Sequence, residues 1–68
     1  MKYDAKQFGL NVRRVRKSRN VSQDQLALKA GIDRSYMGRI ERGQVNVTVE
    51  KAYRLAEALE CDVHDLMP

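Results

Sequence analysis

Residues 22–42 read SQDQLALKAGIDRSYMGRIER and predict two short helices joined by a tight turn. Ser22 is followed three residues later by Gln25, the capping-box spacing at which each side chain bonds the other's backbone N–H, so the first helix begins directly after Ser22. Gly31 can adopt the left-handed conformation that ends a helix, and Asp33 can cap the next one. The stretch therefore predicts a helix-turn-helix.

The two helices of this stretch have inward and outward faces at helical spacing. Leu26, Ala27 and Ala30 share one face of the first helix, and the small Ala27 lets another helix cross closely. Met37 and Ile40 form the inward face of the second helix. Its opposite face carries Ser35, Arg39 and Arg42. Two arginines and a hydroxyl suit the base edges of a major groove, although a plain solvated face is the alternative.

Five segments resemble the helix-turn-helix domain of the lambda-repressor, Cro and Xre family of bacterial and phage regulators. They lie between Phe8 and Leu66 and read VRRVRK, SQDQLA, AG at 30–31, IDRSYMGRIERG and RLAEAL. The resemblance implies an all-α fold, a compact five-helix lambda-repressor-like DNA-binding domain. IDRSYMGRIERG followed by Asn46 and Thr48 is most similar to the small controller proteins of restriction-modification systems.

Two positions depart from the family pattern. Asn20 stands where the family commonly has glycine, and Val47 stands where it often has proline. Asparagine can adopt the left-handed conformation, so the first change is tolerated. Valine leaves the backbone torsion free, so the loop before the next helix is less rigid than with proline.

The resemblance also implies a structural ion pair between Arg16 and Glu41. In the family, an arginine at the position of Arg16 pairs with a glutamate at the position of Glu41. Glu41 follows Ile40 at the edge of an inward face, where an unpaired carboxylate would be costly to bury. We expect the pair to hold the first helix of the chain against the second helix of the helix-turn-helix. The basic residues next to Arg16 are expected to form a solvated face.

The remainder of the chain predicts three further helical segments. The first covers 5–18, with Phe8, Val12 and Val15 as its core stripe. A second covers 49–60 after a cap at Thr48. Its predicted apolar stripe is Val49, Ala52, Leu55, Ala56 and Leu59. The last is a turn capped by Asp62 that holds Val63, Leu66 and Met67.

Length and charge predict one small DNA-facing domain over 1–68. The 68 residues allow a single core. Residues 1–43 carry eleven Lys or Arg against four Asp or Glu, a net charge of +7, whereas 44–68 carry two against five, a net charge of −3. One end of the molecule is therefore expected to face a polyanion, the alternative being a mixed solvated surface.

Composition argues against enzymatic, metal-dependent and membrane functions. One cysteine excludes an internal disulfide and fits a reducing cytoplasm. Cys61 and His64 are too few for a metal site, and no nucleophile has a base beside it. No apolar run is long enough to span a membrane, and residues 1–10 lack a signal-peptide centre. We expect a cytoplasmic binding protein without cofactor, metal or small-molecule ligand.

The resulting hypothesis places helix 33–42 in the major groove of double-stranded DNA as a recognition helix. We assign the base contacts to Arg34, Ser35, Tyr36 and Arg39. Arg34 is expected to contact guanine O6 and N7. Tyr36 either reaches a thymine methyl or phosphate, or packs against the preceding helix. We assign the phosphate contacts to Ser22, Gln23, Arg42, Gln44 and Asn46.

One such domain reads few base pairs, so a homodimer on a near-palindromic operator is expected. We assign the dimer interface to Tyr53, Val63, Leu66 and Met67. The alternative is that these residues close the monomer core. A competing function is a protein-interaction module, such as an antitoxin or adaptor with the same fold. The sequence leaves open the operator, the regulated genes and whether binding activates or represses.

Overall fold

The computed structural model describes residues 4–68, and within them it contains helices and no strand. The elements are α1 (Ala5–Ser18), α2 (Gln23–Ala30), α3 (Arg34–Glu41), α4 (Val49–Leu59) and a 3-10 turn (Val63–Asp65). The all-α prediction is confirmed. The predicted fifth helix is wrong, because the last element is a three-residue turn too short for an α-helical ladder.

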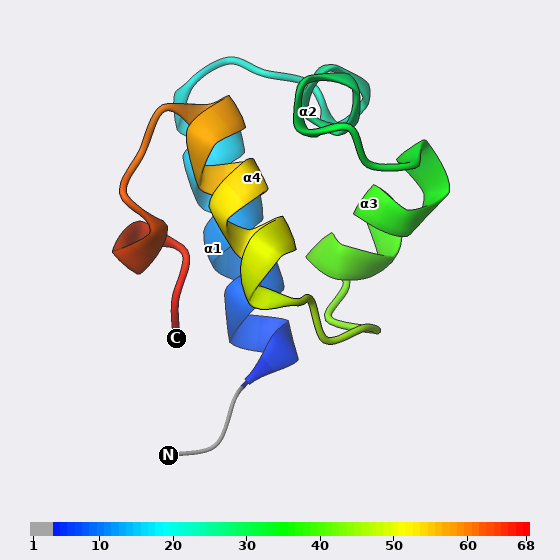
Figure 1. The fold of residues 1–68 in the computed structure, drawn as a ribbon, viewed down its shortest axis with the longest axis vertical. Helices are drawn as coiled ribbons and strands as arrows, with labels where there is room; N and C mark the ends of the chain where they lie inside the picture. Colours follow the sequence, from blue (N-terminus) through cyan, green and yellow to red (C-terminus); the bar gives the residue numbers. More distant parts are fainter. Residues whose placement is uncertain (1–3) are drawn as a thin grey trace.

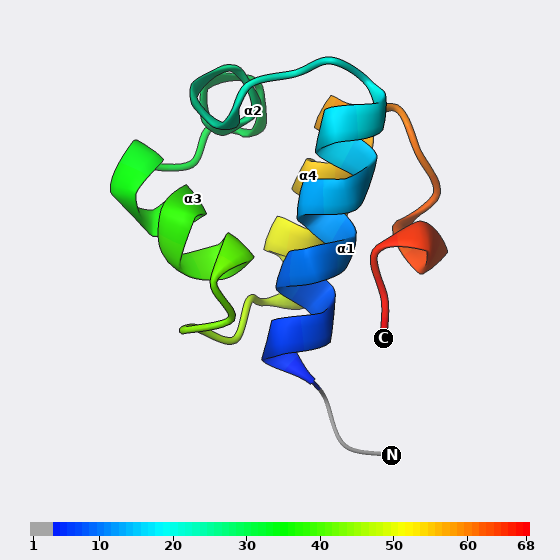
Figure 2. The ribbon, with the colours of Figure 1, turned by 180° about the vertical axis from the view of Figure 1, so that it is seen from behind.

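Helices α1 and α4 lie side by side at the centre of the molecule. Figure 1 and Figure 2 show α2 and α3 on one side of this pair and the C-terminal turn on the other. All four helices and the C-terminal segment contribute to one apolar core. Its fully buried larger side chains are Phe8, Val12, Leu26, Met37, Ile40, Leu55, Leu59 and Leu66. The helix-turn-helix formed by α2 and α3 is thus supported from behind by α1 and α4.

The predicted caps of α2 and α3 are confirmed. Gln25 N–H donates to Ser22 Oγ at 3.0 Å, and Ser22 N–H donates to Gln25 Oε1 at 2.8 Å, which completes the capping box. Gly31 ends α2 with a φ of 68°, in the left-handed region. Asp33 then caps α3. The turn between the two helices is therefore specified by local side chains.

Two details of the predicted α4 are wrong. Val49 retains 70% exposure because it lies at the edge of the buried stripe and shares an outer face with Tyr53, four residues on. The helix ends at Leu59, because Glu60 adopts a left-handed conformation with a φ of 56°. This end is stabilised by Arg19, the residue that follows α1, whose Nε donates to the carbonyl of Leu59 at 2.9 Å.

The crossing of α1 and α3 depends on Gly9, which sequence reasoning did not single out. A Cβ atom at Gly9 would overlap the carbonyl oxygen of Ile40 and come within 2.7 Å of that of Glu41. The backbones of α1 and α3 can therefore approach only over a glycine. This contact sets the position of the second helix of the helix-turn-helix.

A buried asparagine in α1 anchors the C-terminal segment. Asn11 is 7% exposed, and its Nδ2 donates to the carbonyl oxygens of Leu66 and Met67, both at 3.1 Å. The side chain of Leu66 is fully buried beneath this anchor. Leu66 therefore closes the monomer core, the alternative left open by the sequence, and its predicted contact with a second chain is wrong.

Candidate nucleic-acid interface

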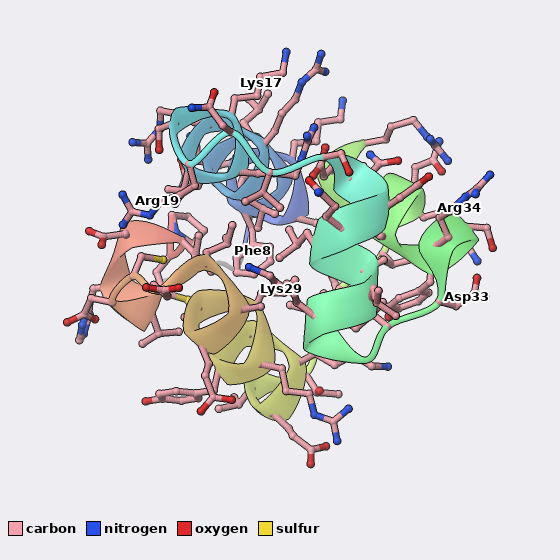
Figure 3. All side chains as sticks on the ribbon, turned by 90° about the horizontal axis from the view of Figure 1, so that it is seen from above. Phe8, Lys17, Arg19, Lys29, Asp33 and Arg34 are labelled. Carbon is pink, nitrogen blue, oxygen red and sulfur yellow. The ribbon has the colours of Figure 1, made fainter. Side chains whose placement is uncertain are left out.

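Helix α3 turns an apolar face inward and a basic polar face outward. Met37 and Ile40 are buried, whereas Arg34, Ser35 and Arg39 are exposed. Figure 3 shows Arg34 at the outer edge of α3, far from the central Phe8. The fold thus exposes three of the four predicted base-contacting side chains along a single helix.

The first turn of α3 is held by the carboxylate of Asp33. Asp33 Oδ2 accepts from the backbone N–H groups of Ser35 at 3.0 Å and Tyr36 at 3.3 Å, and also from the Ser35 hydroxyl. The hydrogen bond from the Ser35 hydroxyl and those two backbone bonds hold the pKa of Asp33 below its usual value. Since Ser35 donates its hydroxyl hydrogen to Asp33, it presents oxygen lone pairs to a ligand.

Arg34 forms an ion pair that the sequence did not predict. Its Nε lies 3.3 Å from Oδ1 of Asp24, in the first turn of α2. Both side chains stay largely exposed, at 75% for Arg34 and 60% for Asp24. The contact spans the two helices of the helix-turn-helix, so no local sequence pattern indicates it.

Tyr36 differs from the other three predicted base-contacting residues because it is half-buried against the core. The Nζ atom of Lys51 in α4 lies 4.6 Å from the centroid of its ring, within the range of a cation–π interaction. Lys51 was not among the predicted site residues. A hollow brings both side chains together with two predicted base readers, and its lining is Gly31, Ile32, Asp33, Ser35, Tyr36, Arg39 and Lys51.

The predicted phosphate-contacting residues fall into two groups. Arg42, Gln44 and Asn46 are exposed and available to a ligand. Ser22 and Gln23 are engaged within the protein, since the Ser22 hydroxyl caps α2 and Gln23 Nε2 donates to Glu41 Oε1 at 3.1 Å.

The space beside Gly38 is filled by side chains of the protein itself. A Cβ atom at Gly38 would lie 3.0 Å from Nη1 of Arg42 and 3.6 Å from Oε1 of Gln23. The glycine is buried, so it makes room for the crossing of these two side chains between α2 and α3.

The structure contains the Arg16–Glu41 ion pair that the family resemblance implied. Arg16 Nε donates to Glu41 Oε2 at 2.7 Å, and Nη2 donates to Oε1 at 3.1 Å. The side chains are 11% and 5% exposed, and Gln23 donates a third bond to the same carboxylate. Nη1 of Arg16 also donates to the carbonyl of Val21 at 3.0 Å. One buried network therefore joins α1, α2 and α3.

The remaining predicted interface residues lie on α4 and in the C-terminal segment. Tyr53 is 59% exposed, whereas Val63 and Met67 are half-buried. Val49 adds a second exposed apolar side chain four residues before Tyr53. A hollow in this region is lined by Glu50, Tyr53, Arg54, Ala56, Glu57, Cys61, Asp62, Val63 and His64.

Residues 4–68 hold no group of three or more His, Cys, Asp or Glu side chains placed to bind a metal ion. Of the helices in this part of the chain, none combines the length and apolar character needed to cross a membrane.

Known proteins share this sequence pattern and this fold. The helix-turn-helix family profile matches residues 12–66. The chain is 44% identical over 57 residues to the control protein C.SmaI of Serratia marcescens, which covers 84% of this chain and 68% of that protein. The structure of the restriction-modification controller protein C.AhdI of Aeromonas hydrophila matches with a TM-score of 0.90 and 41% identity, over 94% of this chain and 97% of that one. SinR, a biofilm master regulator solved in complex with DNA, matches with a TM-score of 0.81 and 33% identity, over 87% and 95%.

Together, the fold and the basic outer face of α3 define a DNA-binding transcriptional regulator and not an enzyme. The chain belongs to the helix-turn-helix family, and it is similar to restriction-modification controller proteins within it.

Proposed function

We propose that this chain is a sequence-specific regulator whose single helix-turn-helix domain inserts α3 into the major groove of operator DNA. The observation that carries the proposal is the outward alignment of Arg34, Ser35 and Arg39 over the buried Met37 and Ile40. A helix fixed through its apolar face presents its outer side chains at a constant depth and angle, which base reading requires. The likeness to controller proteins further suggests control of restriction-modification genes, in the cytoplasm.

Within this function, Arg34 is the principal base reader. It lies in the first turn of α3, the end of the recognition helix that contacts base edges in this class of motif. An arginine makes two parallel hydrogen bonds to O6 and N7 of guanine. Ser35 presents lone pairs and therefore suits a base-edge donor, the N4 amino group of cytosine or the N6 amino group of adenine.

Phosphate contacts come from the exposed Arg42, Gln44 and Asn46 and from the backbone N–H groups that begin α2. Lys51 adds a cation from α4 at the edge of the hollow that holds Ser35 and Arg39. Gln23 contributes chiefly by orienting α2 relative to α3, because its side-chain amide already donates to Glu41 at the end of α3.

We infer that two copies bind a near-palindromic operator as a dimer. The two copies contact each other through the outer face of α4. The support is the exposed apolar pair Val49 and Tyr53, with the half-buried Val63 lining the same hollow as Tyr53 and the half-buried Met67 following in the C-terminal segment. Tyr53→Asp should then lower the mass measured by sedimentation equilibrium from dimer to monomer. Leu28→Asp is a matched control, since Leu28 is 84% exposed on α2. An unchanged mass for Tyr53→Asp would remove this face from the interface.

Selection of bound sites from a random duplex pool tests the function. We expect an enriched site with two related halves, and Arg34→Ala should cost about 1 to 3 kcal/mol and relax the preference at one position in each half. If the dimer neutralises six to ten phosphates, affinity should fall about 10³- to 10⁵-fold between 50 and 200 mM salt. A pool that stays random would leave a protein-interaction module as the function.

A further inference from the structure

Asp24 is an acidic residue on a surface that should bind a polyanion. Its carboxylate projects from the first turn of α2 and would repel a DNA phosphate. The same carboxylate lies 3.3 Å from Nε of Arg34, the principal base reader. In free protein such an exposed pair contributes little to stability. Its effect is therefore expected on the geometry of Arg34.

The nitrogen that meets Asp24 determines which edge of Arg34 stays free. A guanidinium has two edges that can form paired hydrogen bonds, one at Nε and one nitrogen of the terminal fork, the other across Nη1 and Nη2. Asp24 meets Arg34 at Nε. The edge across Nη1 and Nη2 presents two parallel N–H donors, which can match O6 and N7 of guanine. An acid at Nε and a guanine at the fork can therefore be bound at once.

We propose that Asp24 is a positioning residue for base reading: it holds the guanidinium of Arg34 at Nε so that the Nη1–Nη2 edge faces guanine. This inference rests on the function proposed above. Holding the long side chain in one orientation before binding reduces the entropy lost on contact with the base. Because bound DNA excludes water from the pair, the attraction between the two charges also strengthens in the complex.

The position of Asp24 is set by the fold of the helix-turn-helix. The Ser22 capping box fixes the first turn of α2, and the Asp33 cap fixes the first turn of α3. Gly31 fixes the turn between the two helices. The carboxylate and the guanidinium are therefore brought together by the short turn between α2 and α3. They meet at the end of α3 that reads bases.

Asp24→Asn tests the proposal, because two effects of the change have opposite signs. Losing a negative charge should leave affinity for random DNA unchanged or slightly increased. Losing the support of Arg34 should weaken binding to the selected operator about three- to fivefold, the size expected for an exposed pair. The ratio of specific to random binding should therefore fall, as measured by fluorescence anisotropy with both duplexes at one salt concentration.

Three variants make the result specific to Arg34. Glu60→Gln removes one negative charge from an exposed site at the C-cap of α4 and should leave the ratio unchanged. Asp24→Glu keeps a carboxylate and should retain most of the discrimination. In an Arg34→Ala background, Asp24→Asn should have no further effect on the ratio, which a merely structural role would not predict. Thermal melting of each variant checks that the fold is retained.

The opposite outcomes overturn the proposal and identify what fails. If Asp24→Asn strengthens operator and random binding equally, Asp24 acts only as a charge. If it strengthens operator binding more, the carboxylate competes with guanine for Arg34. If Arg34→Ala relaxes one base preference and Asp24→Asn leaves that preference intact, only this inference fails. A parent protein that selects no sequence at all removes the proposed function together with it.

Discussion

Arg16 of α1 and Glu41 at the end of α3 form a buried ion pair with two parallel hydrogen bonds, of 2.7 and 3.1 Å. The bidentate geometry satisfies both carboxylate oxygens, and Gln23 adds a bond from α2. This arrangement compensates for the cost of removing two charges from water. It ties the recognition helix to the helix behind it and so maintains the angle at which α3 is presented.

Removing one partner of this pair should be strongly destabilising. Arg16→Met leaves the Glu41 carboxylate buried without its cation, and we expect a loss of about 3 to 5 kcal/mol in the free energy of unfolding from urea denaturation. Arg13→Met, an exposed arginine of the same helix, is the control and should change stability little. The double variant Arg16→Met, Glu41→Leu should recover part of the loss. A single-variant loss as small as that of the control would show that the pair is not needed.

Two glycine-to-alanine changes should have opposite effects on stability. Gly9→Ala forces a methyl group against the backbone carbonyl of Ile40, so α1 and α3 must separate, at a cost of about 1 to 3 kcal/mol or more. Gly38→Ala meets the flexible end of Arg42 and lies at ordinary contact distance from the Gln23 side chain, while alanine favours the helix by about 1 kcal/mol. Thermal melting should show a lower Tm for the first variant and an equal or higher Tm for the second. The reverse order would contradict this account of the two close contacts.

Asn11→Ala should loosen the C-terminal segment. The variant leaves the buried carbonyl of Leu66, and that of Met67, without the donor that now reaches both. Loss of a buried hydrogen-bond partner typically costs about 1 to 3 kcal/mol. Amide hydrogen exchange should accelerate over 61–68 before it does so in α2. Equal acceleration throughout the chain would mean that Asn11 stabilises the core as a whole.

The cap of α3 should lose strength in acid. Hydrogen bonds from Ser35 and Tyr36 hold the pKa of Asp33 below its usual value of 3.8, so its folded pKa lies below its unfolded one. Such a group stabilises the fold at pH values above the unfolded pKa, and this contribution is lost as the pH falls through the folded pKa. Asp33→Asn should therefore be less stable than the parent at neutral pH, and the difference should shrink below about pH 4.

The measurement for this cap is thermal unfolding followed by circular dichroism between pH 2 and 7. Ser35→Ala removes the hydroxyl bond, which contributes most to the lowered pKa, and should reproduce the effect in reduced form. A stability difference that stays constant across the acid range would refute the role of the Asp33 charge.

Helix boundaries and caps could be predicted from the sequence because their causes are local. Ser22 and Gln25 lie three residues apart and satisfy one another within a single turn. Gly31 and Asp33 act on the backbone next to them in the same way. The Arg16–Glu41 pair spans 25 residues, and it was available in advance only through the resemblance to a family.

Contacts between distant segments were not predictable by the same reasoning. Asp24 and Arg34 meet only because α2 and α3 cross at a particular angle, and Lys51 reaches the ring of Tyr36 from a third helix. For a related reason, Val49 was predicted to be buried but is exposed, and Leu66 was assigned to a dimer interface but is buried. Periodicity identifies an apolar side chain, but it does not show whether another element of the same chain covers it.

By itself, then, the sequence determined the approximate ends of the α-helices, the caps at Ser22, Gly31 and Asp33, and the family to which the chain belongs. The tertiary structure alone decided that Leu66 lies inside, that Gly9 lets α1 and α3 touch, and that an acid stands beside the chief base-reading arginine. The reason is physical. A cap depends on torsions within one turn, whereas these contacts depend on how several helices share one small core, so a change in any of them shifts the rest.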